Sequence, residues 1–177
     1  MPLRGAPATV EARAEFLSLW REALGPALDA RKTWVLRDFH SPNLLWLADR
    51  SGIAQIGLLD FQDAVMGPEA FDVASLLQDA RVDVAEELEM ALFTRYVDGR
   101  VAHGRDFDAG AFGRLYATLA AQRATKILGI FARLDRRDGK PLYLRHLPRI
   151  HAYVCRALRH PALAALREWY HAHVPPP

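Results

Sequence analysis

The sequence carries two short polar motifs in close succession, Arg37-Asp38-Phe39-His40-Ser41-Pro42-Asn43 and Leu59-Asp60-Phe61-Gln62-Asp63. Each motif borders an apolar run of strand composition: Trp34-Val35-Leu36, residues 43–47 and residues 55–59. Residues 48–52, between the last two runs, have the composition of a turn. The pattern predicts a small β-hairpin with polar loops at its ends.

Most of the remaining sequence has the apolar periodicity of helices. We expect helices over residues 10–24, 84–101, 108–136, 142–158 and 161–173, and one more that Gly67-Pro68 opens. Thr9 should cap the first helix and Gly25 should end it, while Pro148 should bend the fourth or mark its true start. Cys155 lies among apolar helical positions and is expected in the core. The fold class is therefore predicted to be mainly α with a small β-hairpin.

Length and composition indicate one globular domain over residues 1–177. Hydrophobic residues make up 51% of the chain and charged residues 25%. A single cysteine cannot form an internal disulfide. No apolar run approaches the roughly 20 residues of a membrane span, and the first residues lack the apolar core of a signal peptide. We expect a cytoplasmic protein without a membrane partner.

Charge is distributed unevenly along the chain. Residues 37–113 contain 6 Arg and no Lys against 14 Asp and Glu, a net charge of −8, whereas residues 114–160 contain 11 Arg and Lys against 2 Asp, a net charge of +9. The acidic block suits divalent cations and the basic block suits phosphates, although both blocks are also compatible with solvated helix faces. No compact basic run or nucleic-acid-binding module is present, so nucleic acid is not an expected partner.

The residue types of the two motifs fit phosphoryl transfer to a hydroxyl. That reaction needs a base beside the attacking hydroxyl and oxygen ligands that hold Mg²⁺ against the phosphates. A carboxylate followed five residues later by an amide supplies both from one loop, with Asp38 as base and Asn43 as metal ligand. Asp60, at the next strand end, would bridge the metal to the phosphates. Mg²⁺ keeps several waters, so one Asp and one Asn suffice.

The same spacing resembles the protein-kinase pattern Asp-x-x-x-x-Asn followed by Asp-Phe-Gly, which here reads Asp60-Phe61-Gln62. The wider sequence resembles the aminoglycoside phosphotransferase and choline kinase family, and within it the bacterial anomeric kinases of N-acetylmuramate and N-acetylglucosamine. Matching stretches are residues 37–45, 57–64, 67–68, 72–80, 122–131 and 136–141. The family often has His two residues before the catalytic Asp, where this chain has Leu36.

The resemblance implies that Asp38 is the catalytic base, that Asn43 and Asp60 bind Mg²⁺, and that ATP is the phosphate donor. It also implies that Asp72 is structural and ties its helix back to the catalytic loop. The chain then corresponds to the C-terminal lobe of a protein-kinase-like phosphotransferase. Its parts would be a leading helix and linker (residues 1–33), the catalytic loop and metal-binding hairpin (34–66) and a helical substrate-binding part (67–177).

The N-terminal nucleotide lobe of such kinases is expected to be absent from this sequence. That lobe carries a phosphate-covering loop and a Lys on a strand. The chain has three lysines, Lys32, Lys126 and Lys140, and none is expected on a strand of the required type. A separate nucleotide-binding lobe is therefore a possible partner.

Three residues beside the motifs have two interpretations each. Arg37 could contact phosphate or stabilise the loop through an acidic partner. His40 could be a second base or a residue that fixes the loop by hydrogen bonding. Asp63 could bind a second metal or a sugar hydroxyl, or cap the bend before the next helix.

Three residues further along the chain are also ambiguous. Asp79 is either a sugar-hydroxyl ligand or a surface cap. Arg123 and Lys126 lie three residues apart on one helix face, and they either reach the substrate or form a helix-surface pair.

The leading hypothesis is a kinase that transfers the γ-phosphate of ATP to a small molecule, an amino sugar at its anomeric hydroxyl. An alternative is a truncated or split kinase lobe that acts as a binding module without activity of its own. A further alternative is an aminoglycoside-modifying kinase.

Overall fold

The computed structural model describes residues 8–104 and 106–174. The chain folds as two compact units, with boundaries between Asp29 and Ala30 and between Phe112 and Gly113. We call the unit formed by Ala30–Phe112 the hairpin unit. The other, which joins the N-terminal helix to the segment that starts at Gly113, we call the helical unit. Most described residues are helical, as predicted. The single domain with three parts stays a prediction.

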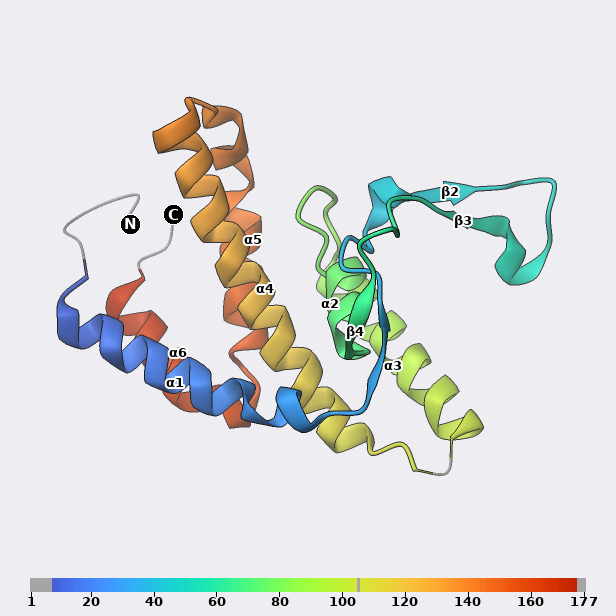
Figure 1. The fold of residues 1–177 in the computed structure, drawn as a ribbon, viewed down its shortest axis with the longest axis horizontal. Coiled ribbons are helices and arrows are strands. Elements are labelled where there is room, and N and C mark those ends of the chain that lie inside the picture. Colours follow the sequence, from blue (N-terminus) through green and yellow to red (C-terminus); the bar gives the residue numbers. More distant parts are fainter. Residues whose placement is uncertain (1–7, 105, 175–177) are drawn as a thin grey trace. The chain divides into compact units, whose positions relative to one another are not determined.

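The helical unit consists of helices only. Its elements are α1 (Val10–Asp29), α4 (Ala109–Asp138, from Gly113 on), a 3-10 turn over Pro141–His146, α5 (Leu147–Ala157), a second 3-10 turn over Pro161–Leu163, and α6 (Ala164–His173). Helices α1 and α6 lie side by side (Figure 1). The indole Nε1 of Trp169 donates to the carbonyl of Ala12 at 3.2 Å, and the rings of Phe16 and Trp169 lie 4.6 Å apart. Ring packing and one part-buried hydrogen bond therefore join the first and last helices of this unit.

The first helix differs from its prediction at one end. Thr9 caps α1 as predicted, because its Oγ1 accepts from the backbone N–H of Ala12 at 3.1 Å. The prediction that Gly25 ends the helix is wrong, since α1 continues through Pro26 to Asp29. Gly25 does not have the positive φ of a helix-ending glycine. The prediction that Pro148 marks a true helix start is confirmed, because it lies in the first turn of α5.

Cys155 lies on the exposed side of α5, so the expectation of a core cysteine is wrong. The buried positions of α5 include Ile150, Tyr153, Val154 and Ala157, which are spaced as one helix stripe. Position 155 falls outside that stripe.

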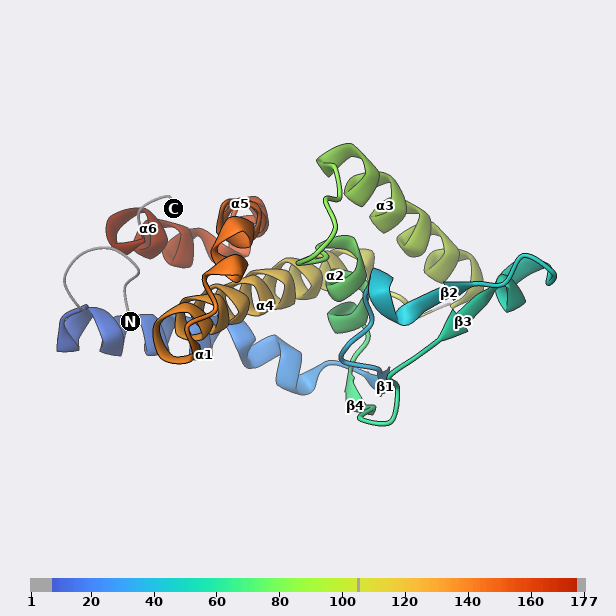
Figure 2. The same cartoon turned by 90° about the horizontal axis from the view of Figure 1, so that it is seen from above.

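The hairpin unit contains two antiparallel strand pairs and two helices. Its elements are β1 (Lys32–Val35), a 3-10 turn over Ser41–Asn43, β2 (Leu44–Trp46), a 3-10 turn over Gly52–Gln55, β3 (Ile56–Leu58), β4 (Val65–Pro68), α2 (Ala70–Leu77) and α3 (Glu86–His103). Strand β2 pairs with β3, which confirms the predicted hairpin, and β1 pairs with β4. The β2–β3 hairpin projects away from α2 (Figure 2).

The prediction that Gly67-Pro68 opens a helix is wrong. Both residues belong to β4, where Gly67 pairs with Thr33 and Pro68 with Lys32. A Cβ added at Gly67 would lie 3.2 Å from Cγ2 of Val35, tighter than most real contacts of this kind. Glycine at this position therefore lets the two strands approach, and α2 begins only at Ala70.

The two units differ in how well they bury large side chains. In the helical unit Ile150, Leu158, Leu163 and Leu166 are almost fully buried. In the hairpin unit the buried helix positions are mostly small, and large apolar residues of the strands and loops are exposed. These are Trp34, Leu45, Trp46, Ile53, Ile56, Leu58, Leu59, Phe61, Val65 and Met66. The hairpin unit therefore has a wide uncovered apolar surface.

We predict that Tyr170→Phe lowers the free energy of unfolding by about 1 kcal/mol. The Thr125 hydroxyl has one proton, which it donates to the carbonyl of Ala121 at 2.7 Å. The Tyr170 hydroxyl, 2.5 Å from Thr125 Oγ1, must then be the donor in that contact. Burial raises the pKa of Tyr170 to about 12, so the phenol keeps its proton at neutral pH.

Urea denaturation of both proteins measures this change. The matched control is Tyr143→Phe, because Tyr143 is 39% exposed and its removal should cost less than about 0.5 kcal/mol. Equal losses in the two variants would contradict a specific contribution from the Tyr170 hydrogen bond.

Candidate active site

The register of the β2–β3 hairpin brings the two polar motifs together. Leu44 pairs with Leu58, and the pairing extends one step further because the backbone N–H of Leu59 donates to the carbonyl of Asn43 at 2.9 Å. Asp60 follows directly after Leu59 in the chain. Asn43 and Asp60, the two predicted metal ligands, are therefore placed at the same end of the hairpin.

The loop between β1 and β2 is closed by its own hydrogen bonds. The N–H of Asp38 donates to the carbonyl of Leu36 at 2.9 Å, and the side-chain amide Nδ2 of Asn43 donates to the carbonyl of Asp38 at 2.9 Å. The N–H of Asn43 also donates to the carbonyl of His40 at 2.9 Å. Both the N–H and the carbonyl of Asp38 are thus hydrogen-bonded, while Asp38 as a whole is exposed to solvent.

Two residues of the site have left-handed backbone conformation. Arg37 has φ 71° and Asp60 has φ 56°, and they are the only residues other than glycine with positive φ in the described part of the chain. Such conformations are uncommon for residues with a Cβ, although Asp tolerates them better than most. They cluster at functional sites, where the surrounding structure enforces them. Here Arg37 directly precedes Asp38, and Asp60 lies in the turn after β3.

Asp72, in the first turn of α2, holds the start of the loop. Its Oδ2 accepts from the N–H of Leu36 at 2.6 Å, and its Oδ1 accepts from the N–H of Arg37 at 3.1 Å. A carboxylate that accepts two backbone donors makes hydrogen bonds stronger than those between neutral groups. These contacts also stabilise the turn in which Arg37 has its left-handed conformation.

Asp79, just beyond the end of α2, holds the far end of the loop. Its Oδ2 accepts from the N–H of Ser41 at 2.9 Å, and its Oδ1 accepts from the N–H of Arg81 at 2.8 Å. Asp79 is completely buried, so it is not a surface cap. Burial acts to raise its pKa, but the donors from Arg81 and Ser41 outweigh burial, and the pKa lies below its ordinary value of 3.8.

His40 is buried beneath the loop and contacts a residue that the sequence did not single out. Its ring nitrogen Nε2 lies 3.2 Å from Nη1 of Arg81, and only 6% of the residue is exposed. Burial and contact with a guanidinium are compatible with a residue that fixes the loop by hydrogen bonding. Neither role assigned to His40 from the sequence is tested by this contact.

The side chains of the remaining candidate residues are exposed or half-buried. Arg37 and Asp63 are exposed. Arg123 and Lys126 lie on α4 in the helical unit, where Arg123 is half-buried and Lys126 is exposed. Their proposed contacts with substrate stay predictions.

The oxygen donors at the end of the hairpin fit a hard divalent cation. The amide nitrogen of Asn43 is directed to the carbonyl of Asp38, which leaves its side-chain Oδ1 for a metal. Oδ1 of Asp60 accepts from Nε2 of Gln62 at 2.5 Å, and its second oxygen is the other candidate donor. Across the described residues no group of three or more His, Cys, Asp or Glu could hold a metal ion. A cation here would therefore need water or phosphate oxygens as additional ligands.

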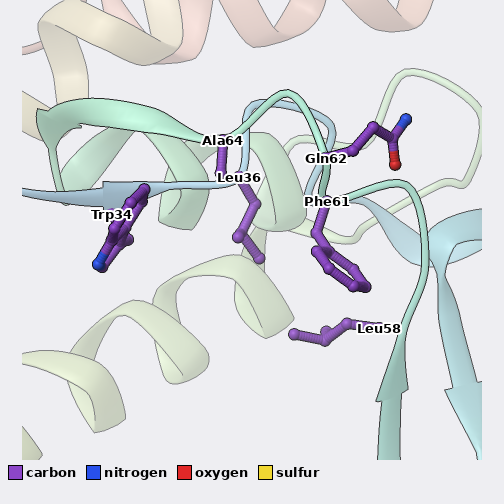
Figure 3. Close-up of a pocket in the computed structure, with 6 residues that line it drawn as sticks. All are labelled: Trp34, Leu36, Leu58, Phe61, Gln62 and Ala64. Atoms are coloured by element: carbon purple, nitrogen blue, oxygen red, sulfur yellow. The ribbon is translucent and has the colours of Figure 1, made fainter.

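An apolar cavity of about 460 Å³ adjoins both motifs. It is lined by Trp34, Leu36, Leu58, Phe61, Gln62 and Ala64. The side chains of Leu36, Leu58 and Phe61 lie close together, whereas Gln62 points away from Phe61 (Figure 3). Leu36 precedes Asp38 by two residues and Phe61 follows Asp60, so this apolar surface is directly attached to both parts of the site.

The chain belongs to the phosphotransferase enzyme family, whose model matches residues 3–103. It is also similar to four curated proteins that are named N-acetylmuramate/N-acetylglucosamine kinase. The Caulobacter vibrioides protein is 41% identical over 164 residues, which cover 93% of this chain and 44% of that protein. The Neisseria meningitidis protein is 39% identical (80% of this chain, 42% of that protein) and the Pseudomonas aeruginosa protein 36% identical (90% and 48%).

This chain therefore spans less than half the length of the curated relatives that it matches. The resemblance to the family, inferred from the motifs, is confirmed. No helix among the described residues is long and apolar enough to cross a membrane.

The sequence did not reveal how α2 is held in place. At its start Glu69 accepts from the hydroxyl of Tyr96 at 3.2 Å and pairs with Arg100. At its end Nε2 of Gln78 donates to Oε1 of Glu89 at 2.9 Å, and Glu89 is buried. Helix α3 thus contacts both ends of α2, which in turn holds the loop. In the sequence, Glu89 shares one face of α3 with Phe93 and Tyr96, but this pattern alone does not separate a buried Glu from a surface charge.

We predict that Asp79→Asn lowers the free energy of unfolding at pH 7 by about 1–3 kcal/mol. An amide can accept from only one of the two N–H groups, and its own NH₂ would face the other. The pKa of Asp79 is lowered in the folded state, so its carboxylate stabilises the fold above pH 3.8 and loses this contribution as the pH falls below that value.

Urea denaturation at several pH values tests this prediction. The difference between the original protein and Asp79→Asn should be full at pH 7 and should shrink below pH 3.8. Asp98→Asn, which changes an exposed carboxylate of α3, is the control and should show little effect. A difference that does not change with pH would contradict the role of the ionised carboxylate.

Proposed function

We propose that this chain is the part of an ATP-dependent sugar kinase that holds the catalytic base and the metal ligands. It corresponds in this proposal to the C-terminal lobe, and a nucleotide-binding part completes the active site. The acceptor is an amino sugar, N-acetylmuramate or N-acetylglucosamine, phosphorylated at its anomeric hydroxyl. The protein would act in the cytoplasm, where ATP and these sugars meet.

In this reaction the sugar hydroxyl oxygen forms a bond to the γ-phosphorus of ATP while the bond from that phosphorus to the bridging oxygen breaks. ADP leaves, and the hydroxyl proton passes to the carboxylate of Asp38. Asp38 suits this task because its backbone is fixed and the residue is exposed to solvent. Its carbonyl accepts from the side-chain amide of Asn43, and its N–H donates to the carbonyl of Leu36. Asn43 and Asp60 would hold Mg²⁺, which when bound neutralises charge on the phosphates.

One observation carries the proposal: the hydrogen bond from Leu59 to Asn43, which places Asn43 and Asp60 at one end of the hairpin. Asn43 is in turn bonded to Asp38. A base and two hard oxygen donors are therefore supplied by two adjoining turns. Positioning and electrostatics provide most of the rate of phosphoryl transfer, so such an arrangement is what the reaction requires.

The choice of an amino sugar is supported by the relatives, whose names give N-acetylmuramate and N-acetylglucosamine as their substrates. An aminoglycoside is a further candidate acceptor. The net charge of −8 over residues 37–113 would favour such a polycation.

We predict that the chain, joined to the part of the Caulobacter relative outside the matched 164 residues, converts N-acetylglucosamine and Mg-ATP to sugar phosphate and ADP. Asp38→Asn should lower kcat by about 10²-fold or more, because the base is lost. The matched control Asp49→Asn changes an exposed Asp in the hairpin turn and should retain activity.

Coupled detection of ADP and mass spectrometry of the product measure this activity. Sugar phosphate formation no greater than that of Asp38→Asn would contradict the kinase proposal. Phosphorylation of an aminoglycoside in preference to both amino sugars would keep the kinase and replace its substrate.

A second candidate function is that of a binding module that lacks activity until another polypeptide covers it. The uncovered apolar surface of the hairpin unit supports this candidate. Trp34 is 69% exposed, Phe61 58% and Leu58 43%, and all three line the cavity beside the site. Burial of this surface by the missing length of the kinase would stabilise the complex and exclude water from the site.

We predict that the isolated chain binds Mg-ATP no more tightly than about 1 mM, because the phosphate-positioning part is missing. It should instead bind the complementary part of the relative, and Trp34→Ala should weaken that binding about tenfold. Ile53→Ala is the control, since Ile53 is 93% exposed and lies outside the cavity. Calorimetry measures both interactions, and micromolar binding of Mg-ATP by the chain alone would contradict the need for a second part.

A further inference from the structure

Two segments far apart in the sequence are joined by a closed ring of contacts beside the catalytic loop. On the loop, Ser41 donates its backbone N–H to Oδ2 of Asp79 at 2.9 Å, and the neighbouring His40 contacts Nη1 of Arg81 through Nε2 at 3.2 Å. On the other segment, Arg81 donates its own N–H to Oδ1 of Asp79 at 2.8 Å. The dipeptide His40-Ser41 is therefore held by the carboxylate of Asp79 and by the guanidinium of Arg81, and the backbone N–H of Arg81 donates to that same carboxylate.

The contact between Arg81 and His40 determines which nitrogen of the imidazole carries the proton. A guanidinium has only N–H donors and no acceptor. Nε2 of His40 must then accept, which requires a neutral imidazole with its proton on Nδ1. Arg81 thus selects one tautomer and one ring orientation for a buried residue that stands two positions after Asp38.

The loop is anchored at its other end by Asp72, through Leu36 and Arg37. Asp38 lies between these two anchors. A rotation of His40 or a loss of the Ser41 contact would release the backbone on the side that leads to Asn43, whose N–H donates to the carbonyl of His40 at 2.9 Å. The position of the amide of Asn43 therefore depends on the ring of contacts around Asp79.

We propose that Asp79 and Arg81 act together as positioning residues, which hold His40 in its Nδ1–H tautomer and thereby fix Asp38 and Asn43 for phosphoryl transfer. The part of this inference that concerns the reaction rests on the kinase function proposed above. Asp79 is then not a ligand of the sugar, because its carboxylate is buried and directed to two backbone N–H groups. Arg81 acts through His40 and does not bind the substrate.

Substitution of the Arg81 side chain separates this role from folding. Arg81 is exposed, so Arg81→Gln should leave the fold intact. The shorter side chain of Gln removes the N–H that donates to Nε2 of His40. Arg81→Lys keeps a charged donor, which makes a single contact. Arg95→Gln is the matched control, since Arg95 is an exposed arginine of α3 in the same unit.

The first experiment is two-dimensional NMR of the 177-residue chain with ¹⁵N-labelled histidine. His40 is assigned by the signal that disappears in His40→Gln, and the ring pattern identifies its tautomer. We expect the Nδ1–H form in the original protein, in Arg81→Lys and in Arg95→Gln, and a mixture of tautomers in Arg81→Gln, with faster exchange of the Ser41 amide hydrogen. An unchanged tautomer and unchanged exchange in Arg81→Gln would overturn the proposal.

The second experiment measures kcat and KM in the completed kinase. Loss of positioning should lower kcat of Arg81→Gln about tenfold or more with KM for sugar and ATP unchanged, and Arg81→Lys should restore most of it. A raised KM with unchanged kcat would make Arg81 a substrate-binding residue and overturn the proposal. If the completed protein has no kinase activity, the proposed function fails, and the NMR experiment alone decides whether Arg81 sets the tautomer of His40.

Discussion

Two carboxylates that accept backbone N–H groups hold the rest of the site in place. Asp72 and Asp79 come from the first turn of α2 and from just beyond its end, and they anchor the two ends of the loop that carries Asp38. A charged acceptor binds a backbone N–H more strongly than a neutral one, and burial makes its loss expensive. The length of α2 therefore sets the distance between the loop anchors, and α3 sets the position of α2 through Glu69 and Gln78.

The hairpin unit has a loop fixed by hydrogen bonds and a large exposed apolar surface. Its loop is fixed by the half-buried carboxylate of Asp72 and the buried one of Asp79, yet exposed Trp34, Phe61 and Leu58 leave an apolar surface open beside both motifs. A two-stranded hairpin with an exposed apolar face is only marginally stable without a cover. The curated relatives are more than twice as long as the parts of them that this chain matches.

Charge follows the division of the chain into two units. The acidic block ends at Gly113 and the basic block begins at Arg114, and the units divide between Phe112 and Gly113. The hairpin unit thus has the negative charge that suits metal ions, and the helical unit has the positive charge that suits phosphates or other anions. Arg123 and Lys126 belong to the helical unit, and their contacts with substrate stay predictions.

The sequence alone was enough to identify the family and to predict the hairpin that brings Asn43 and Asp60, the candidate metal ligands, to one end, because that hairpin is local and its register follows from two short apolar runs. It also predicted the mainly helical composition. Only the tertiary structure revealed that Asp79 is buried, that Arg81 contacts His40, and that Gly67 lies in a strand. The contacts of Asp72, Asp79 and Arg81 with the loop join residues 36, 38 and 41 positions apart, and periodicity carries no information at such separations. An Asp can cap a helix at the surface or anchor a loop, depending on which segments pack against it. Tertiary packing determines which role it has, and sequence spacing does not.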